Sequence, residues 1–366
     1  MRIGLDVMGG DNAPSAILEG AFAARKLLED GEGAGHKLRL IGDAELIEQA
    51  LAEAGLSDHP LYEVEPTQSV IGMAESPVRA IREKSDSSLV RMGELGRAEA
   101  GAARCDAIIS AGNTGACVAT AQMYMRRLPN VVRPGIAVVI PTPHGPVVIC
   151  DVGANPEPKP AHLHQYAHMA AAYAEGVLGV SRARVGVMNI GGEEGKGTPL
   201  IRETQRLCQS DPTLADAYVG SVEGRDLFED AANVVLTEGF TGNVVLKLAE
   251  GLASGIFKII FHEIEKAGPD AVAQFKPILG RVWQKHDYHE FGGAPLLGVN
   301  GICMIAHGSS EARTIHNAIR SAIDYARHDV NGAIVQRLAT LEDAVADASA
   351  EGEAPSAEPV GTGSPA

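Results

Sequence analysis

The chain has 366 residues, 45% of them hydrophobic and 21% charged, and carries a formal net charge of −16 at pH 7. These values are typical of a globular protein with a large core. The acidic balance argues against general nucleic-acid binding, which requires a basic surface. The last 25 residues contain six acids and neither Lys nor Arg. We therefore interpret residues 341–366 as a disordered acidic tail and residues 1–340 as one two-lobed body.

The cysteines and the apolar segments indicate a cytoplasmic protein. The five cysteines are scattered, odd in number and form no Cys-x-x-Cys pair, which is typical of a reducing compartment without a disulfide framework. We expect them to be small core residues. The N-terminus lacks the layout of a signal peptide. The longest apolar region, residues 243–261, is interrupted by Lys247, Glu250 and Lys258, so we expect no membrane-spanning helix.

Short apolar runs that end in Gly, Asn or Asp alternate with alanine-rich helical stretches, which favours a mainly parallel sheet covered on both faces. Pro143-His144-Gly145 joins two of these runs as a hairpin would, so the sheet is predicted to be mixed. The fold class is thus α/β, with three α/β/α layers. The predicted strands are Arg2–Val7, Lys37–Ile41, Ala107–Ser110, Gly135–Ile140, Val147–Cys150, Arg184–Ile190, Ala217–Val219 and Val234–Thr237.

The helical stretches have clear start signals in two places. Ser76-Pro77 resembles an N-cap followed by proline at the first helical position. Asn243 is expected to cap a helical hairpin over residues 243–285, which Gly268-Pro269 breaks into two helices. The other predicted helices are Ser15–Glu29, Ala44–Ala54, a segment from Ser76 to about Lys84, and Ser88–Ala103.

Four glycine-rich loops follow predicted strands, at residues 6–11, 110–115, 189–198 and 238–243. Ligands of open α/β sheets bind beyond the carboxyl ends of strands, where helix N-termini favour anions. A single such loop is commonly structural, because glycine permits tight turns. Four of them, each with Asn, Thr or Lys, favour an anion-binding enzyme.

Several familiar uses of such loops and side chains are excluded. Gly195-Lys196 is not a Walker A loop, since Ile190 and Gly197 stand where that motif needs Gly and Ser/Thr. The first strand is followed by no Gly-x-Gly-x-x-Gly, and a Gly-x-Ser-x-Gly elbow is missing. His162, His164 and His168 cluster, but the sequence shows no acid to accompany them, so we predict no metal site.

The loops supply the candidate site residues. Lys196 can act as a point cation on phosphate or on an oxyanion, although a lysine in such a loop is commonly a solvated charge. The amide of Asn243 can orient a substrate oxygen, and His307 lies beside hydroxyls and can donate to phosphate. Lys196 and Asn243 are the candidates for a catalytic role. The candidates for anion and substrate binding are Gly112, Asn113, Thr114, Gly115, Asp11, Asn189 and His307.

Seven motifs in order, spread from Met1 to about Arg327, resemble the phosphate acyltransferase family of bacterial phospholipid synthesis. One departure stands at Glu238, where the family usually has Asp. The motifs are Met8–Asp11, Ser110–Ala116, Asp151–Asn155, Asn189–Gly197, Gly239–Lys247, Gly292–Gly298 and Ala306–Ser309.

The resemblance implies an enzyme that transfers a fatty acyl group from acyl carrier protein to inorganic phosphate. The acyl-phosphate would then serve a membrane glycerol-phosphate acyltransferase that makes lysophosphatidic acid. It also implies a fold similar to phosphotransacetylases and to isocitrate and isopropylmalate dehydrogenases, a homodimer, peripheral membrane association, and no metal, nucleotide or other cofactor. Phosphate would attack the thioester directly, while Lys196 and Asn243 stabilise the oxyanion.

An acidic carrier protein requires a basic docking surface. Two patches qualify, and either can equally be made of ordinary solvated charges. Other functions remain open at this stage: a phosphotransacetylase that uses acyl-CoA, and a non-catalytic scaffold at the membrane surface. The candidate docking residues are Arg79, Arg82 and Lys84, with Arg126, Arg127 and Arg133 as the alternative.

Overall fold

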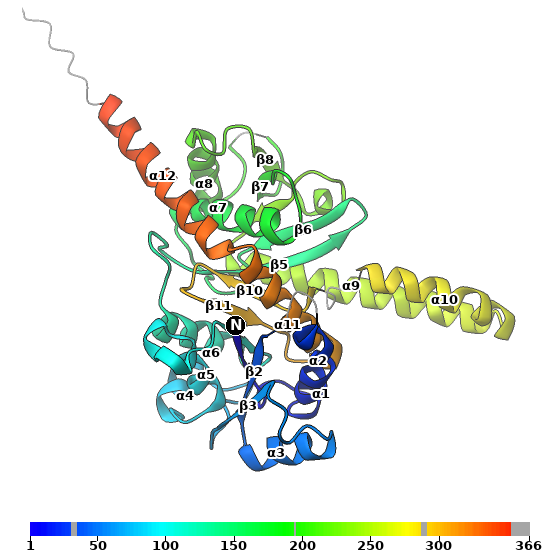
Figure 1. Ribbon diagram of the computed structural model, residues 1–366. Helices are drawn as coiled ribbons and strands as arrows, with labels where there is room; N and C mark the ends of the chain where they lie inside the picture. Colours follow the sequence, from blue (N-terminus) through cyan, green and yellow to red (C-terminus); the bar gives the residue numbers. More distant parts are fainter. Residues whose placement is uncertain (31–34, 194, 287–290, 353–366) are drawn as a thin grey trace, which may run out of the picture.

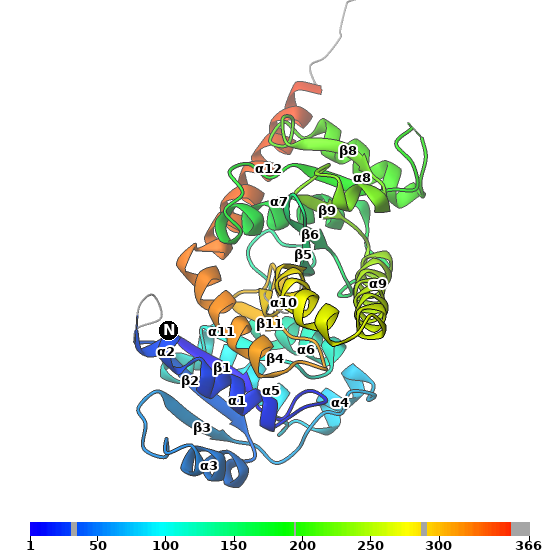
Figure 2. The ribbon, with the colours of Figure 1, turned by 90° about the vertical axis from the view of Figure 1, so that its right-hand side faces the viewer.

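The computed structural model describes residues 1–30, 35–193, 195–286 and 291–352. A single sheet runs through two lobes, with the strand order β3-β2-β1-β4-β11-β10-β5-β6-β9-β7-β8 (Figures 1 and 2). The predicted α/β class and mixed sheet are confirmed. The strands are β1 Arg2–Asp6, β2 Lys37–Gly42, β3 Tyr62–Pro66, β4 Ala107–Ser110, β5 Gly135–Thr142, β6 Gly145–Cys150, β7 Val185–Met188, β8 Tyr218–Val222, β9 Val234–Leu236, β10 Ala294–Leu297 and β11 Ile302–Ile305.

The direction of the strands changes between the lobes. In the lower lobe of Figure 2, β1, β2, β3, β4 and β11 are parallel. Strand β10 is antiparallel to both β11 and β5, and the predicted hairpin reverses the chain from β5 to β6. In the upper lobe β6, β9, β7 and β8 are parallel to one another. The carboxyl ends of the two parallel sets therefore lie at opposite edges of the sheet.

Both faces of the sheet are buried, as the predicted layers require. In β4, Ala107 and Ile109 pack into the core on one face while Ile108 packs into the core on the other, because successive side chains of a strand point to opposite faces. Helices α1, α2, α3, α7, α8, α11 and α12 contribute to the first core, and α4, α5, α6 and α9 to the second. All five cysteines are buried and none forms a disulfide, as expected of core residues.

The helix predictions hold in position but not always in length. Residues 15–29 form two helices that meet at Ala24. The helix that begins at Ser88 ends at Gly96, because the backbone of the next residue, Arg97, is extended. Residues 98–103 and 224–228 are 3-10 turns, and a π-helical turn at residues 121–125 extends α6. The α-helices are α1 Ser15–Ala23, α2 Arg25–Glu29, α3 Ala44–Glu53, α4 Pro77–Glu83, α5 Ser88–Gly96, α6 Thr114–Thr120, α7 Pro160–Val177, α8 Pro199–Ser210, α9 Gly239–Lys266, α10 Pro269–His286, α11 Ala312–Arg327 and α12 Val330–Gly352.

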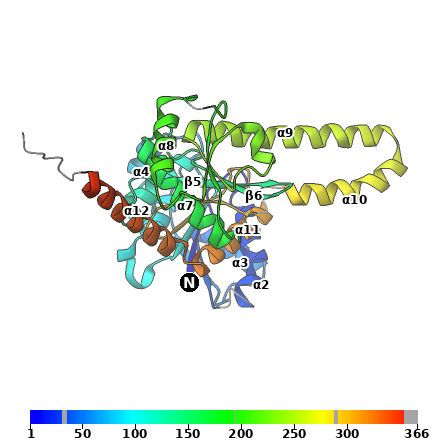
Figure 3. The same cartoon turned by 90° about the horizontal axis from the view of Figure 1, so that it is seen from above.

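Helices α9 and α10 form the predicted helical hairpin, which projects from the body as two long antiparallel helices (Figure 3). Its break falls at Ala267 and Gly268, as expected. In the part of the chain that the structure describes, no helix is long and apolar enough to cross a membrane.

Helix α12 continues past the predicted start of the tail at residue 341 and ends at Gly352. The rest of the predicted tail, residues 353–366, lies outside the described residues. The division of the chain at residue 340 stays a prediction.

Candidate active site

A cavity of about 430 Å³ lies where the two lobes meet, over the central strands β11, β10 and β5. Strand β10 has four residues, so its two ends are only about 10 Å apart. Loops from opposite ends of the strands can therefore reach the same cavity. Its lining divides into a polar group and an apolar group. The polar side chains are Asp11, Thr114, Asn243, Lys247, Glu250, His307 and Thr314, and the large apolar ones are Met73, Ile136, Val138, Val139, Val152, Leu246, Phe291 and Ile305.

The loops after β1 and β4 are joined by a buried carboxylate. Asp6 accepts a hydrogen bond from the Ser110 hydroxyl (2.8 Å), and the Gly112 N–H donates to the same hydroxyl oxygen (3.0 Å). Burial raises the pKa of the Asp6 carboxyl, against the effect of its hydrogen bonds. A Cβ on Gly9 would lie 2.4 Å from Asp6 Oδ2, so only glycine allows this approach. The predicted Gly112 therefore holds the loop together rather than offering its N–H to a ligand.

Asn113 also has a structural position, at the N-cap of α6. Its Oδ1 accepts from the Ala116 N–H (3.0 Å), and its amide donates to the carbonyls of Gly72, Met73 and Glu75. The oxygen and the amide group of this side chain therefore already have hydrogen-bond partners within the protein. The next two residues, Thr114 and Gly115, are exposed and line the cavity at the first turn of α6, where backbone N–H groups favour an anion.

His307 and Asp11 line the cavity from neighbouring loops, because the Asp11 N–H donates to the Gly308 carbonyl (2.7 Å). The Ser309 N–H donates to His307 Nδ1 (3.3 Å), and the Ser309 hydroxyl lies 2.8 Å from the same nitrogen. A backbone N–H can only donate, so Nδ1 is the acceptor nitrogen. The neutral ring then carries its hydrogen on Nε2, where it can be donated to a ligand oxygen.

The start of α9 differs from the sequence prediction. Glu238, not Asn243, is the N-cap: its carboxylate accepts from the Thr241 N–H (2.8 Å) and from the Thr241 hydroxyl. The longer side chain at this position thus serves as a cap. Asn243 lies four residues inside the helix, and Lys247 follows one turn later on the same face. Both residues line the cavity.

Lys247 is the functional candidate that the sequence analysis missed, although it lies within the motif Gly239–Lys247. Its i, i+4 relation to Asn243 would have revealed it once the start of the helix was known. Among the described residues, no ion pair involves Lys247, although Glu250 lines the same cavity. A cation that lines one cavity with Thr114 and His307 is suited to hold an anion.

Lys196 and Asn189 lie away from the cavity lining. Lys196 Nζ forms an ion pair with Glu193 Oε1 (2.6 Å), and Asn189 donates to the Lys196 carbonyl (3.3 Å) and to the Ser221 hydroxyl. Their loop follows β7, which is the parallel neighbour of β9, the strand that precedes α9. The joint role of Lys196 and Asn243 stays a prediction. Glu194 of this loop lies outside the described residues.

The loop after β6 is built around a second buried carboxylate. Asp151 accepts from the N–H groups of Ile136 (2.9 Å), Gly153, Ala154 and Asn155, and burial raises its pKa against these bonds. A Cβ on Gly242 would lie 2.1 Å from the Asp151 carbonyl oxygen. The first turn of α9 thus packs closely against this loop. The contact fixes the orientation of the helix that carries Asn243 and Lys247.

The candidate docking residues surround α4, whose Pro77 packs against Gly115 of the cavity. Arg79 forms an ion pair with Glu83 (2.7 Å), and Lys84 pairs with Glu75. Arg82 is exposed. The patch is therefore close to the cavity, but two of its three charges are partly neutralised.

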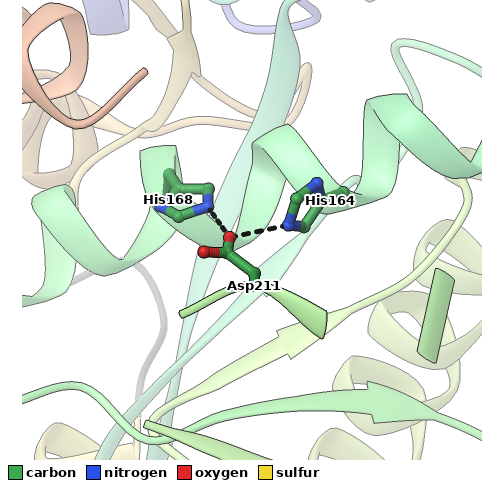
Figure 4. Close-up of side chains that lie close together, drawn as sticks. All are labelled: His164, His168 and Asp211. Carbon is green, nitrogen blue, oxygen red and sulfur yellow. Dashed lines mark hydrogen bonds and ion pairs between the residues drawn. The ribbon is translucent and has the colours of Figure 1, made fainter. Parts of the chain in front are cut away.

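The histidine cluster on α7 corrects another prediction. His162 accepts from the Lys159 N–H at the start of the helix (3.1 Å), whereas His164 and His168 both contact Asp211, which follows α8 (Figure 4). The supporting acid that the sequence analysis did not find lies 43 residues beyond His168. Burial acts to raise the pKa of Asp211, but hydrogen bonds from His164, His168 and Thr213 outweigh it and hold the pKa well below its usual range.

Comparison with known proteins identifies relatives of this chain in sequence and in fold. A family model described as "Fatty acid synthesis protein" matches residues 1–333. Two solved phosphotransacetylases, from Streptococcus pyogenes (TM-score 0.57, 16% identity, covering 91% of this chain and 94% of that one) and Staphylococcus aureus (TM-score 0.55, 15% identity, 90% and 94%), share the fold.

Closer relatives are curated as phosphate acyltransferases. The protein of Geotalea daltonii is 41% identical over 343 residues, covering 92% of this chain and 94% of its own length. That of Bacillus licheniformis is 40% identical over 347 residues, covering 94% and 100%. That of Desulfitobacterium hafniense is 43% identical over 331 residues, covering 88% and 93%. The chain therefore belongs to the phosphate acyltransferase family and is an acyltransferase that transfers an acyl group to phosphate.

Proposed function

We propose that the protein transfers a fatty acyl group from acyl carrier protein to inorganic phosphate and releases acyl-phosphate and the free carrier thiol. The observation that supports this most directly is one cavity lined by polar side chains, including Lys247 and His307, and by large apolar ones, in a chain of this family. Phosphate would contact the polar side chains, and a fatty chain would contact apolar ones such as Ile136, Val138 and Phe291.

The polar end can hold phosphate from both lobes. The N–H groups of Thr114 and Gly115 and the Nε2–H of His307 belong to the lower lobe, whereas Lys247 and Asn243 come from α9. A phosphate oxygen attacks the thioester carbon, the C–S bond breaks, and the carrier sulfur leaves and takes up a proton. Lys247 and the amide of Asn243 stabilise the oxyanion of the tetrahedral intermediate. Phosphate is itself nucleophilic, so no covalent enzyme intermediate is needed.

The activity is tested by incubating the protein with acyl carrier protein that bears a fatty acyl chain. We expect the free carrier thiol to appear only when inorganic phosphate is present, together with an equal amount of acyl-phosphate. Acyl-CoA serves as the alternative donor. Faster turnover with acyl-CoA would identify a phosphotransacetylase, and thiol release without phosphate would contradict acyl transfer to phosphate.

The carrier is expected to dock beside α4, since Arg79, Arg82 and Lys84 lie next to the turn that carries Gly115. Docking there would bring the thioester to the cavity mouth. The acyl-phosphate would then be consumed by a membrane glycerol-phosphate acyltransferase. A partly apolar product that is consumed at the membrane suits an enzyme that associates peripherally with the membrane. Phe275 and Ile278, in the middle of α10, are exposed and could contact lipid.

The protein is also proposed to be a homodimer, because α9 carries a continuous exposed apolar stripe at helical spacing. A stripe of this length on a globular protein calls for a partner surface. Its members are Phe240, Val244, Leu248, Leu252, Ile256 and Ile259.

Leu252→Glu is expected to weaken the dimer, because it would place a carboxylate in the centre of the stripe. We expect a cost of about 2 kcal/mol or more, or roughly a 30-fold rise in the dimer dissociation constant. Light scattering during size-exclusion chromatography measures this. Lys258→Glu adds a carboxylate to another face of the same helix and should leave the dimer intact. A monomeric wild-type protein would contradict the dimer.

A further inference from the structure

The side chains of His164, His168 and Asp211 converge on one point inside the upper lobe, away from the catalytic cavity (Figure 4). The two histidines are four residues apart and so face the same side of α7. Each Nε2 lies 2.8 Å from the same carboxylate oxygen, Oδ2 of Asp211. All three residues are buried, and their ligand atoms lie within 4.8 Å of one another.

We propose that His164, His168 and Asp211 bind one divalent transition-metal cation of the zinc type. Two imidazoles and a carboxylate form a ligand set that favours such cations. Mg²⁺ and Ca²⁺ instead take oxygen ligands. The site is independent of acyl transfer, because none of the three residues lines the catalytic cavity.

The remaining atoms of Asp211 support a metal ligand. Its other oxygen, Oδ1, accepts from the Thr213 N–H (2.8 Å) and the Thr213 hydroxyl (2.7 Å). These bonds fix the carboxylate and leave Oδ2 directed at the two rings, as outer partners do at metal sites. Ligand atoms bound to a tetrahedral zinc ion stand roughly 3.3 Å apart, so the observed 2.8 Å contacts need to open by about 0.5 Å.

An adjoining cavity of about 490 Å³ gives the site an entrance. It is lined by His168 and Thr213 and is open toward Arg182 and Arg337. A water molecule on that side can complete a tetrahedral coordination with three protein ligands. The bound ion would join α7 to the end of α8, in addition to the hydrogen bonds that His164 and His168 form with Asp211. Its effect would therefore be on the stability of the upper lobe.

The test uses tag-free, full-length protein that has been treated with a chelator and then titrated with Zn²⁺ by calorimetry. We expect one equivalent to bind and to remain through desalting, as measured by elemental analysis. His168→Gln and Asp211→Asn should each weaken binding by about 100-fold or more. His162→Gln is the matched control, since His162 lies on the same helix and bonds to Lys159 instead. Equal binding by His168→Gln and wild type would overturn the site.

A measurement on the wild type alone decides the ligand set if a variant fails to fold. X-ray absorption at the zinc edge is expected to show nitrogen and oxygen neighbours that include two imidazoles. The buried thiol of Cys208 lies near Asp211, so a sulfur neighbour would overturn the proposed ligands. Zinc at 100 times its dissociation constant should shift the unfolding equilibrium about 100-fold toward the folded state. No retained zinc, or no change in thermal stability, would contradict the proposal.

Discussion

Lys247→Ala is expected to lower kcat by about 10²–10³-fold, the range found when a donor to an oxyanion is removed. The reason is its position: Lys247 lines the cavity one helical turn after Asn243, and among the described residues it has no carboxylate partner. Part of the loss should appear as a higher KM for phosphate, because the same ammonium group binds the ground-state anion. Steady-state release of the carrier thiol at varied phosphate measures both effects.

Lys196→Ala is the matched comparison, since it removes the same charge from the loop after β7. Lys196 is 45% exposed, is paired with Glu193 and is not among the residues that line the cavity. We therefore expect less than about a fivefold change in kcat. If Lys196→Ala lowered kcat as much as Lys247→Ala does, Lys196 would be a catalytic residue after all. Its loop would then have to reach the cavity during turnover.

Gly242→Ala is expected to destabilise the protein and to reduce its activity together. The added methyl group would lie 2.1 Å from the Asp151 carbonyl oxygen and 2.6 Å from the Thr237 hydroxyl oxygen. The first turn of α9 must then move away from the loop after β6, which costs about 1–3 kcal/mol. The movement also displaces Asn243 and Lys247. Chemical denaturation and the thiol-release assay measure the two effects.

Gly251→Ala makes the same substitution further along α9, where a Cβ would meet nothing within 4 Å. This variant should gain roughly 0.5–1 kcal/mol, because alanine has the higher helix propensity, and its activity should be unchanged. If Gly242→Ala were as stable and active as Gly251→Ala, the contact with Asp151 would not determine the position of the catalytic face.

Local patterns predicted eight of the strands, the helices α1 to α5 and the helical hairpin, whereas α7, α8, α11 and α12 were not predicted. Strand β4 was predicted at its exact bounds because Ala107–Ser110 is a continuous apolar run that is buried on both faces. Three strands were not predicted. In β3, Glu63 and Glu65 made a strand improbable, but β3 stands at an edge, where Glu63 pairs with Arg2 and Arg39. Strands β10 and β11 have four residues each and follow glycine-rich segments.

The candidate site was only partly predictable. Thr114, Gly115, Asp11, Asn243 and His307 line the cavity as members of loops that the sequence singled out. Their proximity depends on the strand order, which no local pattern contains. Lys196 and Asn189, from another of these loops, are not among the residues that line the cavity. The contact of His168 with Asp211 was missed for a similar reason, since it spans 43 residues.

The sheet has few backbone pairings at strand β10, where the two lobes meet. This strand shares two residue pairs with β11 and two with β5, whereas β5 and β6 share six. Pro295 in this strand has no N–H to donate. A hinge rotation at this strand disturbs few hydrogen bonds and leaves those around Asp6 and Asp151 intact. It would alter the separation between Thr114 and Lys247, and with it the contacts that the two lobes can offer to a bound anion.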